Sequence, residues 1–155
     1  IHLRFEGDTF WLNGVDVSAE IRSMQVSEAV SLVAAIPEVR TFLVAQQRIM
    51  GANQSVVMDG RDIGTVVFPK ADLKLFLTAD VNIRAQRRFD ELSAQNASTS
   101  VEEVRNNLAE RDHLDSTRAD SPLVQAADAV PLDATQFTIE SMREHVLDLV
   151  AEYLN

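Results

Sequence analysis

The sequence predicts an α/β protein with a parallel sheet flanked by helices, together with a smaller antiparallel and helical unit near its start. Three short apolar runs predict the sheet, because continuous runs of this kind are typical of strands buried on both faces. They are Ser55–Met58, Leu73–Leu77 and Ala129–Leu132, and helical patterns separate them. We expect residues 1–50 to form one unit and residues 51–155 to form the core domain.

The first 17 residues predict short antiparallel strands. Leu3 and Phe5 alternate with polar neighbours, and Gly7–Asp8 forms a turn. Asn13–Gly14 is a strong hairpin signal, because both residues tolerate a positive φ. Residues 19–50 have apolar positions at helical spacing. Pro37 is expected to begin the second of two helices there.

The helices of the core domain have recognisable ends. Asp80 can cap one helix, and Ser100–Glu103 is a capping-box pattern that opens the next. The polar stretch 93–100 between them is expected to be flexible, and the second helix must end before Pro122. Thr138 is expected to cap a last helix. Five residues of that helix are expected to face inward: Ile139, Met142, Val146, Leu149 and Tyr153.

Composition limits the partners of this chain. Its 155 residues carry a net charge of −10, which argues against nucleic acid or an anionic membrane surface as partners. The chain has no cysteine and no apolar run long enough to cross a bilayer. We expect a cytoplasmic monomer without a thiolate metal site.

The basic residues are nearly all arginine. Of 14 basic residues only Lys70 and Lys74 are lysines. Arginine offers a planar fork of donors that suits phosphate and carboxylate groups. The arginines are therefore either partners of the many acidic residues or parts of a local anion site.

Three clusters could carry chemistry. Asp59–Thr65 (DGRDIGT) packs two carboxylates and a guanidinium beyond the first predicted core strand, where ligands bind in α/β sheets. It is either a turn with a local ion pair or a binding loop, and its position favours a binding loop. Arg111, Asp115 and Arg118 share one helix face. They form either an ion pair with one solvated arginine or a face that holds an anion.

The third cluster lies on the helix after Asp80 and consists of Arg84, Arg87 and Arg88. A basic flank of this kind is either simply solvated or an anion clamp on a hinged segment. The three histidines of the chain show no spacing that suggests a metal site.

Taken together, these motifs resemble those of bacterial cytidylate kinases. The run DGRDIGTVVFP at Asp59–Pro69 is similar to the signature loop of that family. Weaker matches lie in the right order on both sides of this loop, along essentially the whole chain: Val17–Ser18, Glu20–Arg22, Ser31–Arg40, Glu110–Asp112, Asp115, Arg118–Ala119, Ser121–Leu123, Ala127–Val130 and Leu132–Asp133.

The resemblance implies transfer of the γ-phosphoryl group from ATP, with Mg²⁺, to CMP or dCMP. Arg61 and Arg118 would hold the CMP phosphate, and Arg111 and Asp115 would contact the ribose. Asp59 would lie near the phosphates and the metal. The expected catalytic residues are therefore Asp59, Arg61 and Arg118, with no protein cage for the metal.

The same resemblance implies that Asp62, Ser31 and Arg40 read the cytosine base. A carboxylate can accept a hydrogen bond from the exocyclic amine of cytosine, whereas uracil presents an oxygen there. Residues 84–118 would include the lid over ATP, with Arg87 as its main contact and Arg84 and Arg88 as helpers. Residues 1–50 would be the insert that binds the nucleoside monophosphate.

One feature of the family is absent from the sequence. No G-x-x-x-x-G-K-[ST] motif of a P-loop occurs, although in the family the P-loop strand lies between the strands expected at 55–58 and 73–77. We interpret the chain as roughly the C-terminal two-thirds of a P-loop nucleoside monophosphate kinase, with an incomplete parallel sheet. The alternatives are an incompetent fragment that at most binds CMP, and a kinase for another pyrimidine monophosphate such as UMP.

Overall fold

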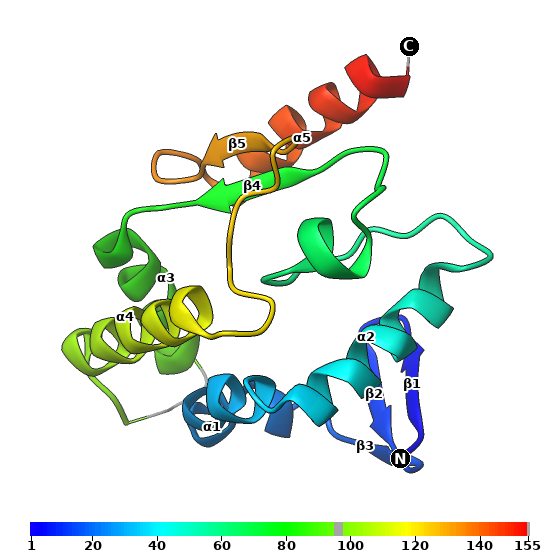
Figure 1. The fold of residues 1–155 in the computed structure, drawn as a ribbon. Helices are drawn as coiled ribbons and strands as arrows, with labels where there is room; N and C mark the ends of the chain where they lie inside the picture. Colours follow the sequence, from blue (N-terminus) through cyan, green and yellow to red (C-terminus); the bar gives the residue numbers. More distant parts are fainter. Residues whose placement is uncertain (95–97, 155) are drawn as a thin grey trace.

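The computed structural model describes residues 1–94 and 98–154 of the chain (Figure 1). Its strands form two separate sheets, an antiparallel one in the order β1-β2-β3 and a parallel pair of β4 and β5. The strands are β1 (Leu3–Glu6), β2 (Thr9–Leu12), β3 (Val15–Asp16), β4 (Leu75–Thr78) and β5 (Val130–Asp133).

The antiparallel sheet confirms the predicted hairpins. Gly7 lies in the turn between β1 and β2, with Glu6 opposite Thr9. Asn13 and Gly14 have φ values of 51° and 84°, as a tight turn between β2 and β3 needs. The turn chemistry of the sequence therefore sets the register of this sheet.

Helices make up most of the rest of the described chain. They are η1 (Glu20–Arg22), α1 (Met24–Ala34), α2 (Pro37–Gly51), α3 (Val81–Ala94), α4 (Val101–Thr117) and α5 (Ile139–Leu154), with a single π-helical turn, η2 (Ile63–Val67). Pro37 begins α2 as predicted. Asp80 and Thr138 accept hydrogen bonds from backbone N–H groups at the starts of α3 and α5. Residues 95–97 of the stretch expected to be flexible lie outside the described residues.

The parallel pair confirms the α/β architecture. Leu75 lies opposite Val130 and Leu77 opposite Leu132, and the chain between the two strands contains α3 and α4 (Figure 1). At the start of β4, Nζ of Lys74 donates to Asp128 at 2.7 Å. Lys74 therefore ties the segment before β5 to the segment before β4.

The prediction of a strand at Ser55–Met58 is wrong. These residues form no strand, and Val57 is fully exposed at 105%. None of the described strands lies beside this segment, so its backbone has no neighbouring strand with which to form hydrogen bonds. An apolar β-branched run shows a preference for the strand conformation, but a sheet also needs a neighbour.

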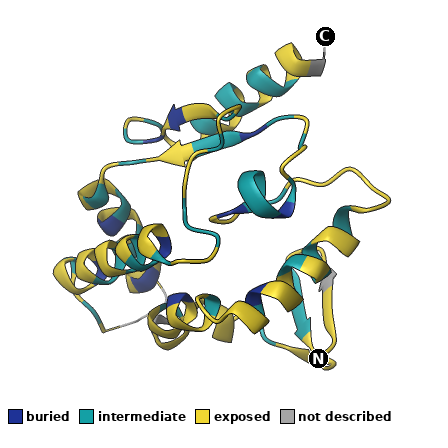
Figure 2. Ribbon diagram, viewed as in Figure 1, coloured by how far each residue is buried: buried dark blue, intermediate teal, exposed yellow. Residues whose placement is uncertain are grey.

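The main apolar core lies between α3 and α4. Ala85, Leu92 and Val104 are buried there, with Phe89 and Leu108 packed around them. Figure 2 shows buried positions on both of these helices. The core fixes where the C-terminal end of α4 lies, and that end contributes to the pocket described below.

The prediction that all five apolar residues of α5 face inward is wrong for two of them. Ile139 and Tyr153 are 85% and 52% exposed, whereas Met142, Val146 and Leu149 are partly buried. The helix has 16 residues, so it is about 24 Å long, while each four-residue strand spans roughly 13 Å. A sheet of this size cannot cover both ends of α5.

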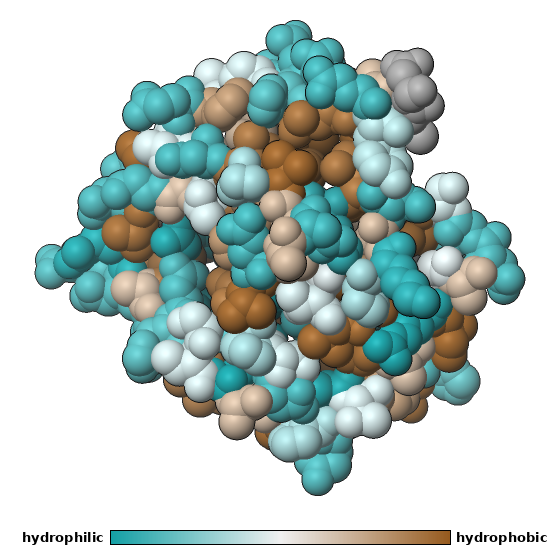
Figure 3. Space-filling model, turned by 45° about the horizontal axis from the view of Figure 1, so that its top comes forward, coloured by the Kyte–Doolittle hydropathy of each residue, from teal (hydrophilic) through white to brown (hydrophobic). Residues whose placement is uncertain are grey.

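The surface mixes polar and apolar areas. Figure 3 shows several apolar patches separated by hydrophilic side chains on one face of the molecule. Among the described residues, no helix combines the length and the hydrophobicity needed to cross a bilayer.

The capping box of α4 predicts a measurable contribution to stability. Ser100 Oγ accepts from the backbone N–H of Glu103 at 3.2 Å, and the Glu103 carboxylate accepts from the backbone N–H of Ser100 at 2.8 Å. We expect Ser100→Ala to lower the free energy of unfolding by about 1 kcal/mol. Urea denaturation followed by circular dichroism measures this change.

Ser98→Ala is the matched control, because Ser98 is exposed and forms no hydrogen bond within the described chain. The hydrogen bonds from Ser100 lower the pKa of Glu103. The stabilisation from Glu103 is therefore present above the ordinary carboxyl pKa and is lost as the pH falls through the lowered value. Equal unfolding midpoints for Ser100→Ala and the parent protein at neutral pH would contradict the assignment.

Candidate functional site

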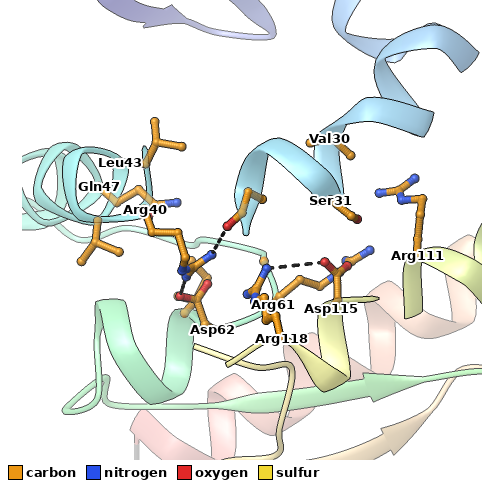
Figure 4. Close-up of a pocket in the computed structure, with 14 residues that line it drawn as sticks. Val30, Ser31, Arg40, Leu43, Gln47, Arg61, Asp62, Arg111, Asp115 and Arg118 are labelled. Carbon is orange, nitrogen blue, oxygen red and sulfur yellow. Dashed lines mark hydrogen bonds and ion pairs between the residues drawn. The ribbon is translucent and has the colours of Figure 1, made fainter. Parts of the chain in front are cut away.

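A pocket of about 310 Å³ lies between α1, α2, the loop before η2 and the C-terminal end of α4 (Figure 4). Residues far apart in the sequence meet in it. Its 14 lining residues are Val30, Ser31, Ala34, Arg40, Leu43, Val44, Gln47, Gly60, Arg61, Asp62, Ile63, Arg111, Asp115 and Arg118.

This pocket brings together all seven residues expected to bind substrate: Ser31, Arg40, Arg61, Asp62, Arg111, Asp115 and Arg118. Its wall carries four arginines and two aspartates, so it is locally positive in a chain with a net charge of −10. The expected residue Asp59 is exposed and does not line the pocket.

Arg40 and Asp62 form a buried ion pair at one side of the pocket. The Arg40 guanidinium donates through Nη2 to the Asp62 carboxylate, and both side chains are about one-tenth exposed. Nη1 of Arg40 also donates to the carbonyl of Ala34, at the end of α1. The backbone carbonyl of Asp62 accepts from the last three N–H groups of η2, including that of Val66 at 2.8 Å. The π-helical turn thus holds Asp62 where it meets Arg40.

Asp115 organises the other side of the pocket. Its carboxylate, 3% exposed as a residue, accepts from Nε of Arg61 at 2.9 Å and lies 3.5 Å from Nη1 of Arg118. Nε of Arg118 donates to the carbonyl of Ser121 at 2.8 Å, which fixes the plane of the guanidinium. Figure 4 shows Arg61 and Arg118 on either side of this carboxylate.

Arg111 does not pair with Asp115, although the spacing on α4 allows it. Nη1 of Arg111 donates instead to Oγ of Ser27 on α1, at 2.6 Å. The simple alternative from the sequence, an ion pair between Arg111 and Asp115 with a solvated Arg118, is therefore wrong. Asp115 joins Arg61 and Arg118, and Arg111, Asp115 and the C-cap residue Arg118 all line the pocket at the end of α4.

Several donors in the pocket wall are left without partners. Nε of Arg40, Nε of Arg111 and Nη2 of Arg118 are buried and make no hydrogen bond within the described residues. Burial, followed by the charge of Arg61, lowers the pKa of Arg111. Burial, followed by the charge of Arg40, lowers the pKa of Arg118. Buried cationic donors without acceptors are costly, so the arrangement suits an anionic ligand that supplies the acceptors.

The arginines of α3 lie outside this pocket and contact protein groups. Arg84 forms an ion pair with Asp112 at 2.7 Å. Arg87 donates through Nη2 to three carbonyls of the segment between β5 and α5, and Arg88 donates to the carbonyl of Arg22 at 2.9 Å. The expected anion clamp on α3 stays a prediction.

Sequence reasoning missed some of the pocket wall. Gln47 lies seven residues after Arg40 on α2, on the same helix face as Leu43 and Val44. Helical spacing counted from Arg40 could have found it. Arg48 was also missed; it donates to the carbonyls of Val66 and Val67 and so anchors η2 to α2.

The pocket has no metal cage. No group of three histidine, aspartate or glutamate residues within 1–94 and 98–154 is arranged to hold a metal ion. The chemistry of the wall is that of anion binding by guanidinium groups, with carboxylates that can accept hydrogen bonds from a polar ligand.

The parallel pair of strands with flanking helices, together with the arginine-lined pocket, is consistent with a nucleoside monophosphate kinase-like α/β class. Comparison with known proteins agrees with this class and narrows it. The model of the family described as cytidylate kinase matches residues 1–152. The chain belongs to the cytidylate kinase family.

Individual relatives support the assignment. The cytidylate kinase of Flavobacterium psychrophilum is 53% identical over 140 residues, which are 90% of this chain and 62% of that protein. The cytidylate kinase of Parabacteroides distasonis is 53% identical over 141 residues, 91% of this chain and 61% of the relative. The cytidylate kinase of Bacteroides fragilis is 49% identical over an alignment of 159 residues, which covers 99% of this chain and 68% of that protein. The chain spans about three-fifths of the length of the first two relatives.

Proposed function

We propose that this chain carries the acceptor site of an enzyme that transfers the γ-phosphoryl group of ATP to CMP or dCMP. The proposal is carried by one pocket that has unpartnered buried guanidinium donors of Arg111 and Arg118 on one side and the Asp62 carboxylate, paired with Arg40, on the other. Such a pocket can hold a phosphate and a base with an exocyclic amine at the same time. The names of the relatives support CMP as the acceptor.

Arg61 and Arg118 are proposed to hold the CMP phosphate. Asp115 keeps both guanidinium groups close together, at 2.9 Å and 3.5 Å, which places two positive charges at one location. Phosphoryl transfer needs little covalent chemistry, but it needs a positioned acceptor and positive charge around the moving group. Arg111 and the remaining lone pairs of Asp115 are proposed to contact the ribose.

The base site is proposed to consist of Asp62, Ser31 and Arg40. Ser31 is 4% exposed and lies in the same pocket as the buried Arg40–Asp62 pair. The Asp62 carboxylate accepts from the amine of cytosine, and uracil would place an oxygen against it. A buried polar mismatch of this kind discriminates strongly between two similar ligands.

ATP and Mg²⁺ belong to the proposed whole reaction. Mg²⁺ is usually held by one or two carboxylates together with substrate phosphates. Asp59 is exposed and is proposed to lie near a Mg²⁺ ion that the nucleotide phosphates hold. Arg84, Arg87 and Arg88 are proposed to act from a lid at about residues 84–118. Residues 1–50 are proposed as the insert that binds CMP, and residues 51–155 as part of the core of a monomer.

Binding separates this proposal from its alternatives. Isothermal titration calorimetry should show CMP bound more tightly than UMP by about a hundredfold, because uracil would place an oxygen against the Asp62 carboxylate. A coupled assay of ADP release then tests turnover with ATP and Mg²⁺. Binding of CMP without turnover would support the alternative of an incompetent fragment, and a preference for UMP would overturn the choice of base.

A further inference from the structure

Ser27 joins two helices that form opposite walls of the pocket. Its Oγ, on α1, accepts from Nη1 of Arg111 on α4 at 2.6 Å. The same hydroxyl donates to Oδ1 of Asn107, one turn earlier on α4, at 3.3 Å. One hydroxyl can serve both contacts, because it carries one donor and two lone pairs. Ser27 itself does not line the pocket.

The contact with Ser27 occupies only one corner of the Arg111 guanidinium. Nε of Arg111 is buried without a partner, and Nη2 makes no hydrogen bond within the described residues. Nε and Nη2 form one edge of the planar group, and such an edge binds two oxygens side by side. Figure 4 shows Arg111 reaching from α4 towards α1 beside Val30 and Ser31. Ser27 therefore leaves both donors of this edge of Arg111 without a hydrogen-bond partner among the described residues.

Among the described residues, no other acceptor forms a hydrogen bond with the Arg111 guanidinium. Asp115 is one turn from Arg111 on α4, but its carboxylate is engaged by Arg61 and Arg118. Without the hydroxyl of Ser27, the Arg111 guanidinium would lose the one described side-chain hydrogen bond that orients it. A long side chain without such an anchor samples several rotamers, and ligand binding must then select one of them.

We propose that Ser27 is a positioning residue for the nucleotide. It holds Nη1 of Arg111 so that the edge formed by Nε and Nη2 faces the ribose and phosphate of CMP. This inference rests on the proposed function, since it takes CMP as the ligand of the pocket. It adds a residue that neither the pocket lining nor the sequence motifs include.

The test uses the full chain and calorimetric titration with CMP. We expect Ser27→Ala to weaken CMP binding about tenfold, because a hydrogen bond to a charged group is lost. Ser27→Thr keeps the hydroxyl and should restore the affinity to within about threefold of the parent. Asn107→Ala removes the other partner of Ser27 but leaves Arg111 held, so it should also stay within about threefold.

A double substitution separates positioning from a general structural role. If Ser27 acts through Arg111, then Ser27→Ala should cause no further loss of CMP affinity in an Arg111→Ala background. Independent, additive losses would overturn the proposal, and so would parent-like affinity in Ser27→Ala. Absence of CMP binding in the unaltered protein would overturn the proposed function and this inference with it. Normal CMP binding in both proteins would overturn this inference alone.

Discussion

Replacing Arg118 by alanine is expected to weaken CMP binding about a hundredfold, since a buried charged donor to the phosphate is lost. Nη2 of Arg118 is buried and makes no hydrogen bond within the described residues, and the rest of its guanidinium is held by Asp115 and the carbonyl of Ser121. Cytidine has no phosphate, so its affinity should change by no more than about threefold. Calorimetric titrations with CMP and cytidine measure the two effects in the same protein.

The controls for this prediction are Arg118→Lys and Arg105→Ala. Lysine keeps the charge but not the planar fork, so its loss of CMP affinity should lie between those of the parent and the alanine variant. Arg105 lies exposed on the same helix, α4, and does not line the pocket, so Arg105→Ala should bind CMP normally. Asp115 retains Arg61 as a partner in Arg118→Ala, which favours a folded variant. Equal losses for CMP and cytidine would rule out the phosphate role.

The second large effect is expected for Asp62→Asn. An asparagine amide can donate to the O4 oxygen of uracil, whereas the carboxylate accepts only from the amine of cytosine. The preference for CMP over UMP should therefore fall by at least about thirtyfold, as for other buried polar mismatches. Titration of parent and variant with CMP and UMP gives this ratio directly.

The same substitution should also destabilise the fold, because Arg40 loses its buried counter-charge. Both side chains of the pair are about one-tenth exposed, and the loss of one partner of such a pair costs about 3 kcal/mol. Urea denaturation measures this cost, and titrations are made where circular dichroism shows the variant folded. Asp62→Glu is the matched control, because it retains a carboxylate and should retain the preference for cytosine. A CMP preference unchanged in Asp62→Asn would contradict the assignment of the base site.

Local features of the fold were predictable because they depend on residues close in the sequence. The turn at Asn13–Gly14, the start of α2 at Pro37 and the capping box at Ser100 are all observed. Each involves a backbone preference or a hydrogen bond within a few residues. The prediction failed at Ser55–Met58, where the strand preference was real but no described strand lies beside the segment.

Which residues line the pocket was also predictable, but the hydrogen bonds and ion pairs among them were not. The resemblance of Asp59–Pro69 and the later motifs named all seven of the expected substrate-binding residues that line the pocket. It did not show that Asp115 would contact Arg61, 54 residues away, in place of Arg111 on its own helix. It gave no sign that Ser27 would hold Arg111 across 84 residues.

The sequence alone determined the capped starts of several helices, the hairpin turns and the acidic character of the chain, and its resemblance to a known family indicated seven of the residues that line the pocket. Only the tertiary structure decided which guanidinium meets which carboxylate, which donors stay free for a ligand, and that Val57 is exposed. The physical reason is the range of the interactions involved. Caps and turns act over a few residues, whereas the pairing of buried charges depends on how α1, α2, η2 and α4 pack together.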